Sequence, residues 1–129
     1  MDDNNNLFKE FQSVLKNPIM IEGIEQYLSD WRGVFEGRVK FVVFPSTTEE
    51  VSKILKLANK NNIPIVPQGG NTGLCGGATP DNSGNSILIS FTKLNNIRNI
   101  DLLGNTVTVE AGCILENILN VFQEKDRIF

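Results

Sequence analysis

Apolar and turn-forming residues alternate along the chain in a way that predicts short helices and strands. Residues 39–44 form an almost continuous apolar run, which predicts a strand buried on both faces. Pro45 ends that run. Apolar positions then recur at helical spacing, which predicts a helix that ends at Asn61-Asn62 and turns one face inward, namely Val51, Ile54, Leu55 and Ala58.

Polar residues mark where this helix starts. Ser46-x-x-Glu49 and Thr47-x-x-Glu50 are two overlapping capping boxes, in which side chains satisfy the first free N–H groups of a helix. Residues 63–68 predict the next strand. Segment 39–68 is therefore expected to form a β-α-β unit with parallel strands and a right-handed crossover.

The flanking segments show the same alternation. Residues 4–16 predict an amphipathic helix that Asn5 or Asn6 would cap and Asn17-Pro18 would end; a short helix is possible near residues 25–28. Three further strands are expected at 86–90, 97–101 and 106–111, the last two joined by a tight hairpin at Gly104-Asn105. Residues 114–124 predict a closing helix whose inward side chains are Ile114, Leu115, Ile118, Leu119 and Phe122.

Composition narrows the possible functions. The chain has 129 residues, a net charge of −3 and no basic patch, so nucleic acid and anionic membranes are poor partners. It contains no histidine, which removes the commonest general base and metal ligand. No apolar run is long enough to span a membrane, and the polar start does not have the character of a signal or transit peptide. Cys75 and Cys113 are expected to be reduced thiols, which favours a cytoplasmic location.

One glycine-rich stretch follows the strand at 63–68. Glycine lets a ligand approach the backbone, and successive N–H groups can then turn toward one anion. We therefore predict a cradle for a phosphate or diphosphate, with the Thr72 hydroxyl and the Asn71 amide as added donors. The candidate cofactor-binding residues are Pro67, Gln68, Gly69, Gly70, Asn71, Thr72, Gly73, Leu74, Gly76 and Gly77.

Two familiar phosphate motifs are absent from this stretch. A P-loop needs a lysine, and no lysine or arginine lies from Gly69 up to Lys93. The dinucleotide fingerprint needs G-x-G-x-x-G before a helix, whereas the spacing here is Gly70-x-x-Gly73-x-x-Gly76, followed by turn residues 79–85. Backbone N–H groups of the loop would therefore be the main donors to an anion. A surface loop without a ligand is the simpler alternative.

Three motifs in order resemble FAD-linked oxidases of the vanillyl-alcohol oxidase and p-cresol methylhydroxylase (PCMH) type. They are the glycine stretch 67–77, the helix entry Phe44-Pro45-Ser46-Thr47-Thr48-Glu49-Glu50-Val51, and Val109-Glu110-Ala111-Gly112-Cys113-Ile114-Leu115. The similarity is greatest to the D-2-hydroxyglutarate and D-lactate dehydrogenase branch. Cys75 is a departure, because a small apolar residue is expected there. The resemblance implies an α/β (α+β) fold, the first lobe of a PCMH-type FAD-binding domain, with a small β-α-β parallel sheet and further strands flanked by helices.

The resemblance also implies a function. Residues 67–77 would hold the FAD pyrophosphate, with Ser90 and the Asn95 region near the same cofactor. We expect residues 1–36 to form an N-terminal helical segment and residues 37–129 the first lobe. The family continues into a second lobe and a substrate domain, so the end at Asp126-Arg127-Ile128-Phe129 is expected to be an interruption. No catalytic or metal-binding set is expected in this chain, because in this branch those residues belong to the substrate domain.

Three functional hypotheses follow. The chain is the FAD-binding lobe of an oxidoreductase for a small D-2-hydroxy acid, binding FAD weakly or not at all alone and inactive without a second lobe or partner chain. Alternatively, it is a non-catalytic remnant or interaction module without a ligand, or a nucleotide-binding protein unrelated to flavin. An incomplete lobe would leave apolar surface and a sheet edge uncovered, so self-association is expected, with the C-terminal helix as the candidate contact surface.

Overall fold

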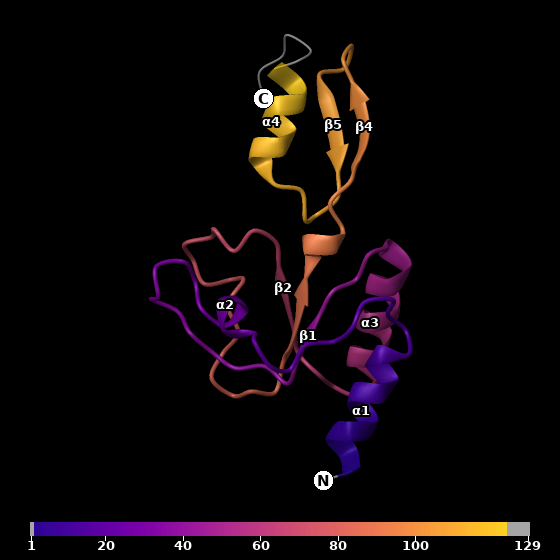
Figure 1. The fold of residues 1–129 in the computed structure, drawn as a ribbon, viewed down its shortest axis with the longest axis vertical. Helices are drawn as coiled ribbons and strands as arrows, with labels where there is room; N and C mark the ends of the chain where they lie inside the picture. The colour runs from indigo at the N-terminus through magenta and orange to yellow at the C-terminus, as the bar shows by residue number, and fades with distance from the viewer. Residues whose placement is uncertain (1, 124–129) are drawn as a thin grey trace.

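The computed structural model describes residues 2–123 and has a mixed α/β fold, as expected (Figure 1). In chain order the elements are α1 (Asp2–Gln12), α2 (Glu25–Leu28), β1 (Val42–Val43), α3 (Thr48–Lys60), β2 (Ile65–Gln68), β3 (Ile87–Ser90), the 3-10 turn η1 (Phe91–Lys93), β4 (Ile97–Asp101), β5 (Thr106–Val109) and α4 (Leu115–Gln123). Across residues 2–123, no helix has the length and apolar character that crossing a membrane requires.

A small parallel sheet forms the centre of the fold. Its strand order is β1-β3-β2, and β3 pairs in parallel with both neighbours. The strands of the predicted β-α-β unit, β1 and β2, are therefore parallel but separated by β3. Met20 pairs antiparallel with Val42 along the outer side of β1. Pro67 lies in β2, the other edge strand, where a missing N–H is tolerated.

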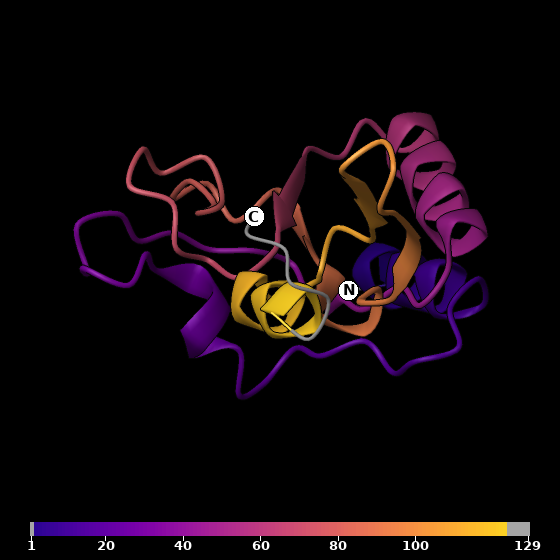
Figure 2. The same ribbon diagram turned by 90° about the horizontal axis from the view of Figure 1, so that it is seen from above.

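Both faces of the sheet are covered, which explains the continuous apolar run at 39–44. Figures 1 and 2 show α1 and α3 on one side of the sheet, and α2 with the glycine-rich loop on the other. The α1–α3 side buries one cluster, formed by Phe11, Leu15, Ile19, Phe41, Val43, Ile54, Ala58, Ile87 and Ile89. The opposite side buries a second, formed by Ile24, Val42, Phe44 and Leu88. Neighbouring residues of each strand therefore face different clusters, as in other parallel sheets.

Only one of the two predicted capping boxes forms at the start of α3. Thr47 is the N-cap, and its Oγ1 accepts from the Glu50 N–H at 3.1 Å. The Glu50 carboxylate turns back and accepts from the Ser46 N–H at 2.6 Å and from the Lys16 N–H at 2.8 Å. Glu49 is exposed and makes no such bond within the described residues. Of the predicted inward face, Ile54 and Ala58 are buried, whereas Leu55 is exposed.

The first and last helices differ from their predicted limits. Asn5 and Asn6 lie inside α1 instead of capping it, because the helix already begins at Asp2. It ends at Gln12, whose side chain donates to the Asn17 carbonyl and accepts from the Ile19 N–H. In α4, Ile118 and Phe122 are buried as expected, but the predicted inward residues Ile114 and Leu115 are 61% and 56% exposed. Residues 124–129, which hold the predicted last helical residue and the predicted interruption, lie outside the described residues.

The hairpin and α4 form a unit at the end of β3, which we call the hairpin module (residues 95–123; Figure 1). Gly112 attaches this module to the sheet. Its N–H donates to the Leu94 carbonyl at 2.8 Å, and a Cβ at this position would lie 1.8 Å from the Phe91 carbonyl oxygen. Only a glycine lets the two backbones approach so closely.

Replacing Gly112 tests this attachment. Gly112→Ala forces the Phe91 and Leu94 backbone away, so we expect the free energy of unfolding to fall by more than about 2 kcal/mol. Chemical denaturation followed by circular dichroism measures the loss. Gly77→Ala is the matched control, because a Cβ at Gly77 meets no atom within 4 Å. Equal stability of the two variants would contradict the close approach at Gly112.

The cap at Glu50 predicts a dependence of stability on pH. Burial alone would raise the pKa of Glu50, but hydrogen bonds from the Ser46 and Lys16 N–H groups outweigh it and lower the pKa below the ordinary 4.5. Its stabilisation is therefore complete above pH 4.5 and is lost as the pH falls through the folded pKa. Glu50→Gln should cost about 1 kcal/mol at pH 7 and less at acidic pH, whereas Glu49→Gln should cost little. Urea denaturation between pH 7 and 3 measures both, and similar losses would refute this role.

Candidate functional site

The predicted site lies at one edge of the parallel sheet. Because β1, β2 and β3 are parallel, their carboxyl ends meet at that edge, where open α/β sheets bind ligands. Segment 69–86 leaves the end of β2 there and crosses to the start of β3 without forming a helix. We call residues 67–78 the glycine loop. Figures 1 and 2 show it beside α2, on the side of the sheet away from α1 and α3.

Gln68 holds the two ends of the glycine loop together. Its side chain is only 2% exposed, and its Nε2 donates to the Ala78 carbonyl at 2.9 Å and to the Tyr27 carbonyl at 3.0 Å. Gly69 follows, and a Cβ there would lie 3.3 Å from the Ala111 carbonyl oxygen. The base of the loop therefore contacts both the α2 region and the hairpin module.

Two side chains fix the middle of the glycine loop. Asn71 has a positive φ of 54°, and its Nδ2 donates to the Ser29 carbonyl at 2.8 Å. The Arg32 Nη2 donates to the Leu74 carbonyl at 2.7 Å. One N–H of the Asn71 amide therefore anchors the loop, and its predicted contact with an anion stays a prediction.

The backbone N–H groups of the glycine loop are free. Across residues 70–78, all of which the structure describes, no N–H donates to a protein oxygen. Gly70, Thr72, Gly73, Leu74 and Gly77 are exposed, and so is the Cys75 thiol. Pro67 is exposed at the end of β2, and Gly76 has a φ of 75° and lies against the Phe35 ring. The loop thus combines exposed residues, several of them glycine, with backbone N–H groups that no protein oxygen binds.

Sequence reasoning missed the contribution of Asp30 and Arg32. The Asp30 carboxylate is 3% exposed and accepts from the N–H groups of Val34 and Phe35 and from the Arg32 Nε. The Phe35 hydrogen bond is the main cause that lowers the pKa of Asp30, with help from Arg32 and against the effect of burial. Arg32 lies 42 residues before Leu74 in sequence, so no local pattern could have indicated their contact.

Ser90 lies beside Gln68 at the base of the glycine loop, and its expected place near the cofactor stays a prediction. It is fully buried, pairs in register with Gln68, and its Oγ is 3.2 Å from the Thr92 Oγ1. Asn95 is exposed and donates from Nδ2 to the Thr92 carbonyl. The contacts of both residues within residues 2–123 are structural and do not indicate acid–base chemistry.

Glu110, a carboxylate outside the loop, has structural partners. Glu110 accepts from the Asn96 N–H and forms an ion pair with Arg98 at 3.0 Å, and the Asn96 bond is the main cause that lowers its pKa. Among residues 2–123, no three His, Cys, Asp or Glu side chains gather in a way that could hold a metal ion.

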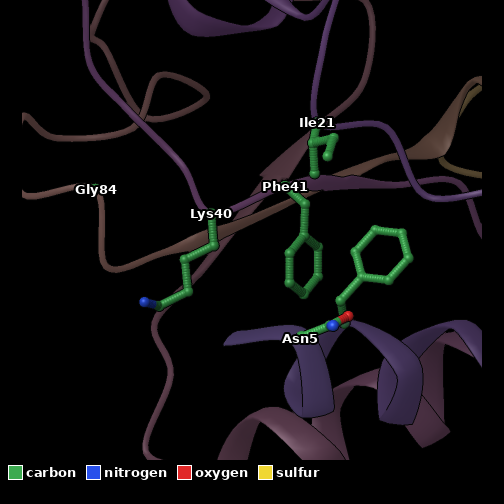
Figure 3. Close-up of a pocket in the computed structure, with 6 residues that line it drawn as sticks. Asn5, Ile21, Lys40, Phe41 and Gly84 are labelled. Atoms are coloured by element: carbon green, nitrogen blue, oxygen red, sulfur yellow. The ribbon is translucent and has the colours of Figure 1, made fainter. Parts of the chain in front are cut away.

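A cavity of about 490 Å³ lies at the other end of the sheet. Lys40 and Phe41 precede β1, and Gly84 lies just before β3, so the cavity opens at the amino ends of the strands. Figure 3 shows Phe41 directed toward α1 and the Lys40 side chain extending away from the Phe41 ring. None of its lining residues belongs to the predicted site.

Comparisons with known proteins give the family. The model described as "FAD binding domain" matches residues 39–129. D-2-hydroxyglutarate dehydrogenase, mitochondrial, of Danio rerio is 38% identical over 99 residues, covering 77% of this chain and 18% of that protein. The D-2-hydroxyglutarate–pyruvate transhydrogenase of Saccharomyces cerevisiae is 30% identical over 124 residues, covering 92% of this chain and 25% of that protein. The mitochondrial D-lactate dehydrogenase [cytochrome] 1 of the same yeast is 39% identical over 95 residues, covering 73% of this chain and 16% of that protein.

Solved structures agree with this result. p-Cresol methylhydroxylase with substrate bound superposes with a TM-score of 0.78 at 25% identity, covering 95% of this chain and 25% of that chain. 4-Ethylphenol oxidase from Gulosibacter chungangensis shares the fold, with a TM-score of 0.78 at 21% identity. The match covers 95% of this chain and 24% of that chain.

The chain spans a quarter or less of the length of these relatives. The word mitochondrial in two of the names describes those proteins, and the cytoplasmic location expected for this chain stays a prediction. The matched segment covers most of the chain, including the glycine loop and the hairpin module. The chain therefore belongs to the FAD binding domain family, among FAD-linked oxidoreductases related to D-2-hydroxyglutarate and D-lactate dehydrogenases.

Proposed function

We propose that residues 67–77, within the glycine loop, hold the diphosphate of FAD. The observation that carries the proposal concerns Gly70, Gly73 and Gly77. None of them has a positive φ, and a Cβ at any of them would meet no atom within 4 Å. Neither backbone conformation nor packing therefore requires glycine at these positions. A ligand that approaches the backbone would require it.

The free donors of the loop support the same proposal. The N–H groups of residues 70–78 have no protein acceptor, and they lie at the carboxyl edge of the parallel sheet. A diphosphate accepts several such bonds at once, and backbone dipoles compensate its charge without a lysine. Because the net charge of the chain is −3, attraction must come from these local dipoles.

If this site holds FAD, the residues of this chain bind and orient the cofactor. Flavins supply hydride and electron transfer, and the protein supplies binding and orientation. Loop N–H groups and the Thr72 hydroxyl would bind the diphosphate, and Gln68 would keep the loop closed at its base. We assign no proton abstraction to this chain, and its proposed role is to hold the cofactor.

We further propose that the chain serves an oxidoreductase for a small D-2-hydroxy acid, the class named in its relatives. It spans a quarter or less of them, so residues 37–129 would be the first lobe of the FAD-binding domain. A second lobe and a substrate domain would come from further chain or from a partner. The 129 residues alone are then not expected to oxidise a hydroxy acid.

FAD binding tests the proposal directly. About half of the cofactor contacts would come from the second lobe, so we expect the isolated chain to bind FAD with a Kd on the order of 1 mM. ADP, which shares the diphosphate, should compete, whereas riboflavin, which lacks it, should not. Quenching of flavin fluorescence measures each interaction. No effect of ADP, or equal binding of riboflavin, would contradict a diphosphate site.

A larger side chain at Gly73 should change the affinity for FAD without changing the stability of the fold. Gly73→Val places a branched side chain beside the free N–H groups, so we expect at least about a tenfold loss of FAD or ADP affinity. The melting temperature should change little, because the position is exposed and uncrowded. Val34→Ala is a control at another exposed apolar site. Unchanged affinity in Gly73→Val would place the ligand elsewhere.

The exposed start of α4 suggests where a second lobe or another copy would contact the chain. Ile114 and Leu115 lie side by side in sequence and are more than half exposed. We expect concentration-dependent self-association of the isolated chain, and Ile114→Ser with Leu115→Ser should weaken it. Sedimentation velocity over a range of concentrations measures the change. A monomer at all concentrations would argue against this contact surface.

A further inference from the structure

We propose that Arg32 is a positioning residue for the glycine loop, tying the buried Asp30 carboxylate to the Leu74 carbonyl so that the loop N–H groups stay ordered and free. This inference rests on the proposed diphosphate site and adds a residue to it. Arg32 lies before residue 39, where the match to the family model begins.

The Asp30 end of this connection is rigid. Asp30 begins a tight turn in which its N–H donates to the Phe35 carbonyl and the Gly33 N–H donates to the Asp30 carbonyl. One carboxylate oxygen accepts from the N–H groups of Val34 and Phe35 at 2.7 and 2.9 Å. The other oxygen accepts from the Arg32 Nε at 3.1 Å. The guanidinium is therefore held by a carboxylate that is itself fixed to the backbone.

The turn is also attached to the rest of the fold. The Gly37 N–H donates to the Leu28 carbonyl, and a Cβ at Gly37 would lie 1.9 Å from the Pro80 carbonyl oxygen. The Arg38 N–H donates to the Asp81 carbonyl. Residues 28–38 therefore pack closely against the segment that follows the glycine loop and give Arg32 a fixed base.

The Leu74 end lies in the middle of the glycine loop. Side chains hold the loop through two of its carbonyl groups and one amide: Ala78 O accepts from Gln68 at the base of the loop, Leu74 O accepts from Arg32, and Asn71 donates to Ser29. None of these bonds uses a backbone N–H of residues 70–78. The loop is thus fixed in a way that leaves its donors for a ligand.

The chemistry of arginine suits this position. A guanidinium is planar and carries its donors in a rigid fork, so Nε can bind Asp30 while Nη2 binds Leu74. A lysine has one compact ammonium group on a flexible stem. It cannot hold both hydrogen bonds, to Asp30 and to Leu74, in one fixed geometry. Among the described residues, Arg32 is the one side chain that binds a carbonyl of residues 72–77, so its loss should leave this part of the loop less ordered.

The test uses the 129-residue chain labelled with ¹⁵N. In the wild type, we expect amide order parameters near about 0.85 at Gly73 and Gly76, and in Arg32→Gln values below about 0.6. The Kd for ADP should rise about tenfold, because the loop must be ordered when the ligand binds. Arg32→Lys should show the same two effects, since it keeps the charge and loses the fork. Restored order and affinity in Arg32→Lys would overturn the positioning role and assign the effect to charge.

Arg38→Gln is the matched control. It removes one positive charge from an exposed residue of the same segment, so loop order and ADP affinity should stay at wild-type values. Melting temperatures of all variants show whether each is folded. Unchanged order parameters in Arg32→Gln would overturn the inference even if the wild type binds no ADP. If the wild type binds no ADP but Arg32→Gln still loosens the loop, the diphosphate site is refuted. The positioning of the loop by Asp30, Arg32 and Leu74 is then supported by itself.

Discussion

The crossover between β2 and β3 is the constraint on which the rest of the structure depends. Neighbouring parallel strands must be joined by a chain that returns from one edge of the sheet to the other. Most such crossovers contain a helix, which satisfies its own backbone groups. Here segment 69–86 crosses without one, and the N–H groups of residues 70–78 find no protein acceptor. The connection that this topology requires therefore provides free hydrogen-bond donors at the edge of the sheet where ligands bind.

A loop with so few internal bonds needs support from its surroundings. The support comes from two parts of the chain: residues 27–38 contact the loop through Gln68, Asn71 and Arg32, and the Ala111-Gly112 turn of the hairpin module lies against Gly69 and η1. Both contacts require close backbone approach, at Gly37 and at Gly112. Glycine therefore has two distinct roles in this chain. At those two positions it lets backbones pack together, and in the loop it leaves space open.

The sequence predicted the local features of this arrangement well. Apolar runs located the central strands, Thr47 and Glu50 identified the start of α3, and the glycine stretch falls at the carboxyl end of β2. Long-range pairing had no local signal, so the insertion of β3 between β1 and β2 was not predicted. The same holds for Arg32 and Leu74, whose contact spans 42 residues. Helical spacing alone also could not show that Ile114 and Leu115 stay exposed, because nothing within residues 2–123 covers them.

The central claim is that the free N–H groups of the glycine loop bind a diphosphate. An amide-resolved NMR titration of the ¹⁵N-labelled chain with FAD tests it most directly. The account predicts saturable shifts of the amide signals of Gly70, Gly73 and Gly77, while signals from α1 and α3 stay unchanged. Unchanged loop signals at millimolar FAD, or shifts confined to the cavity beside Lys40 and Phe41, would contradict it.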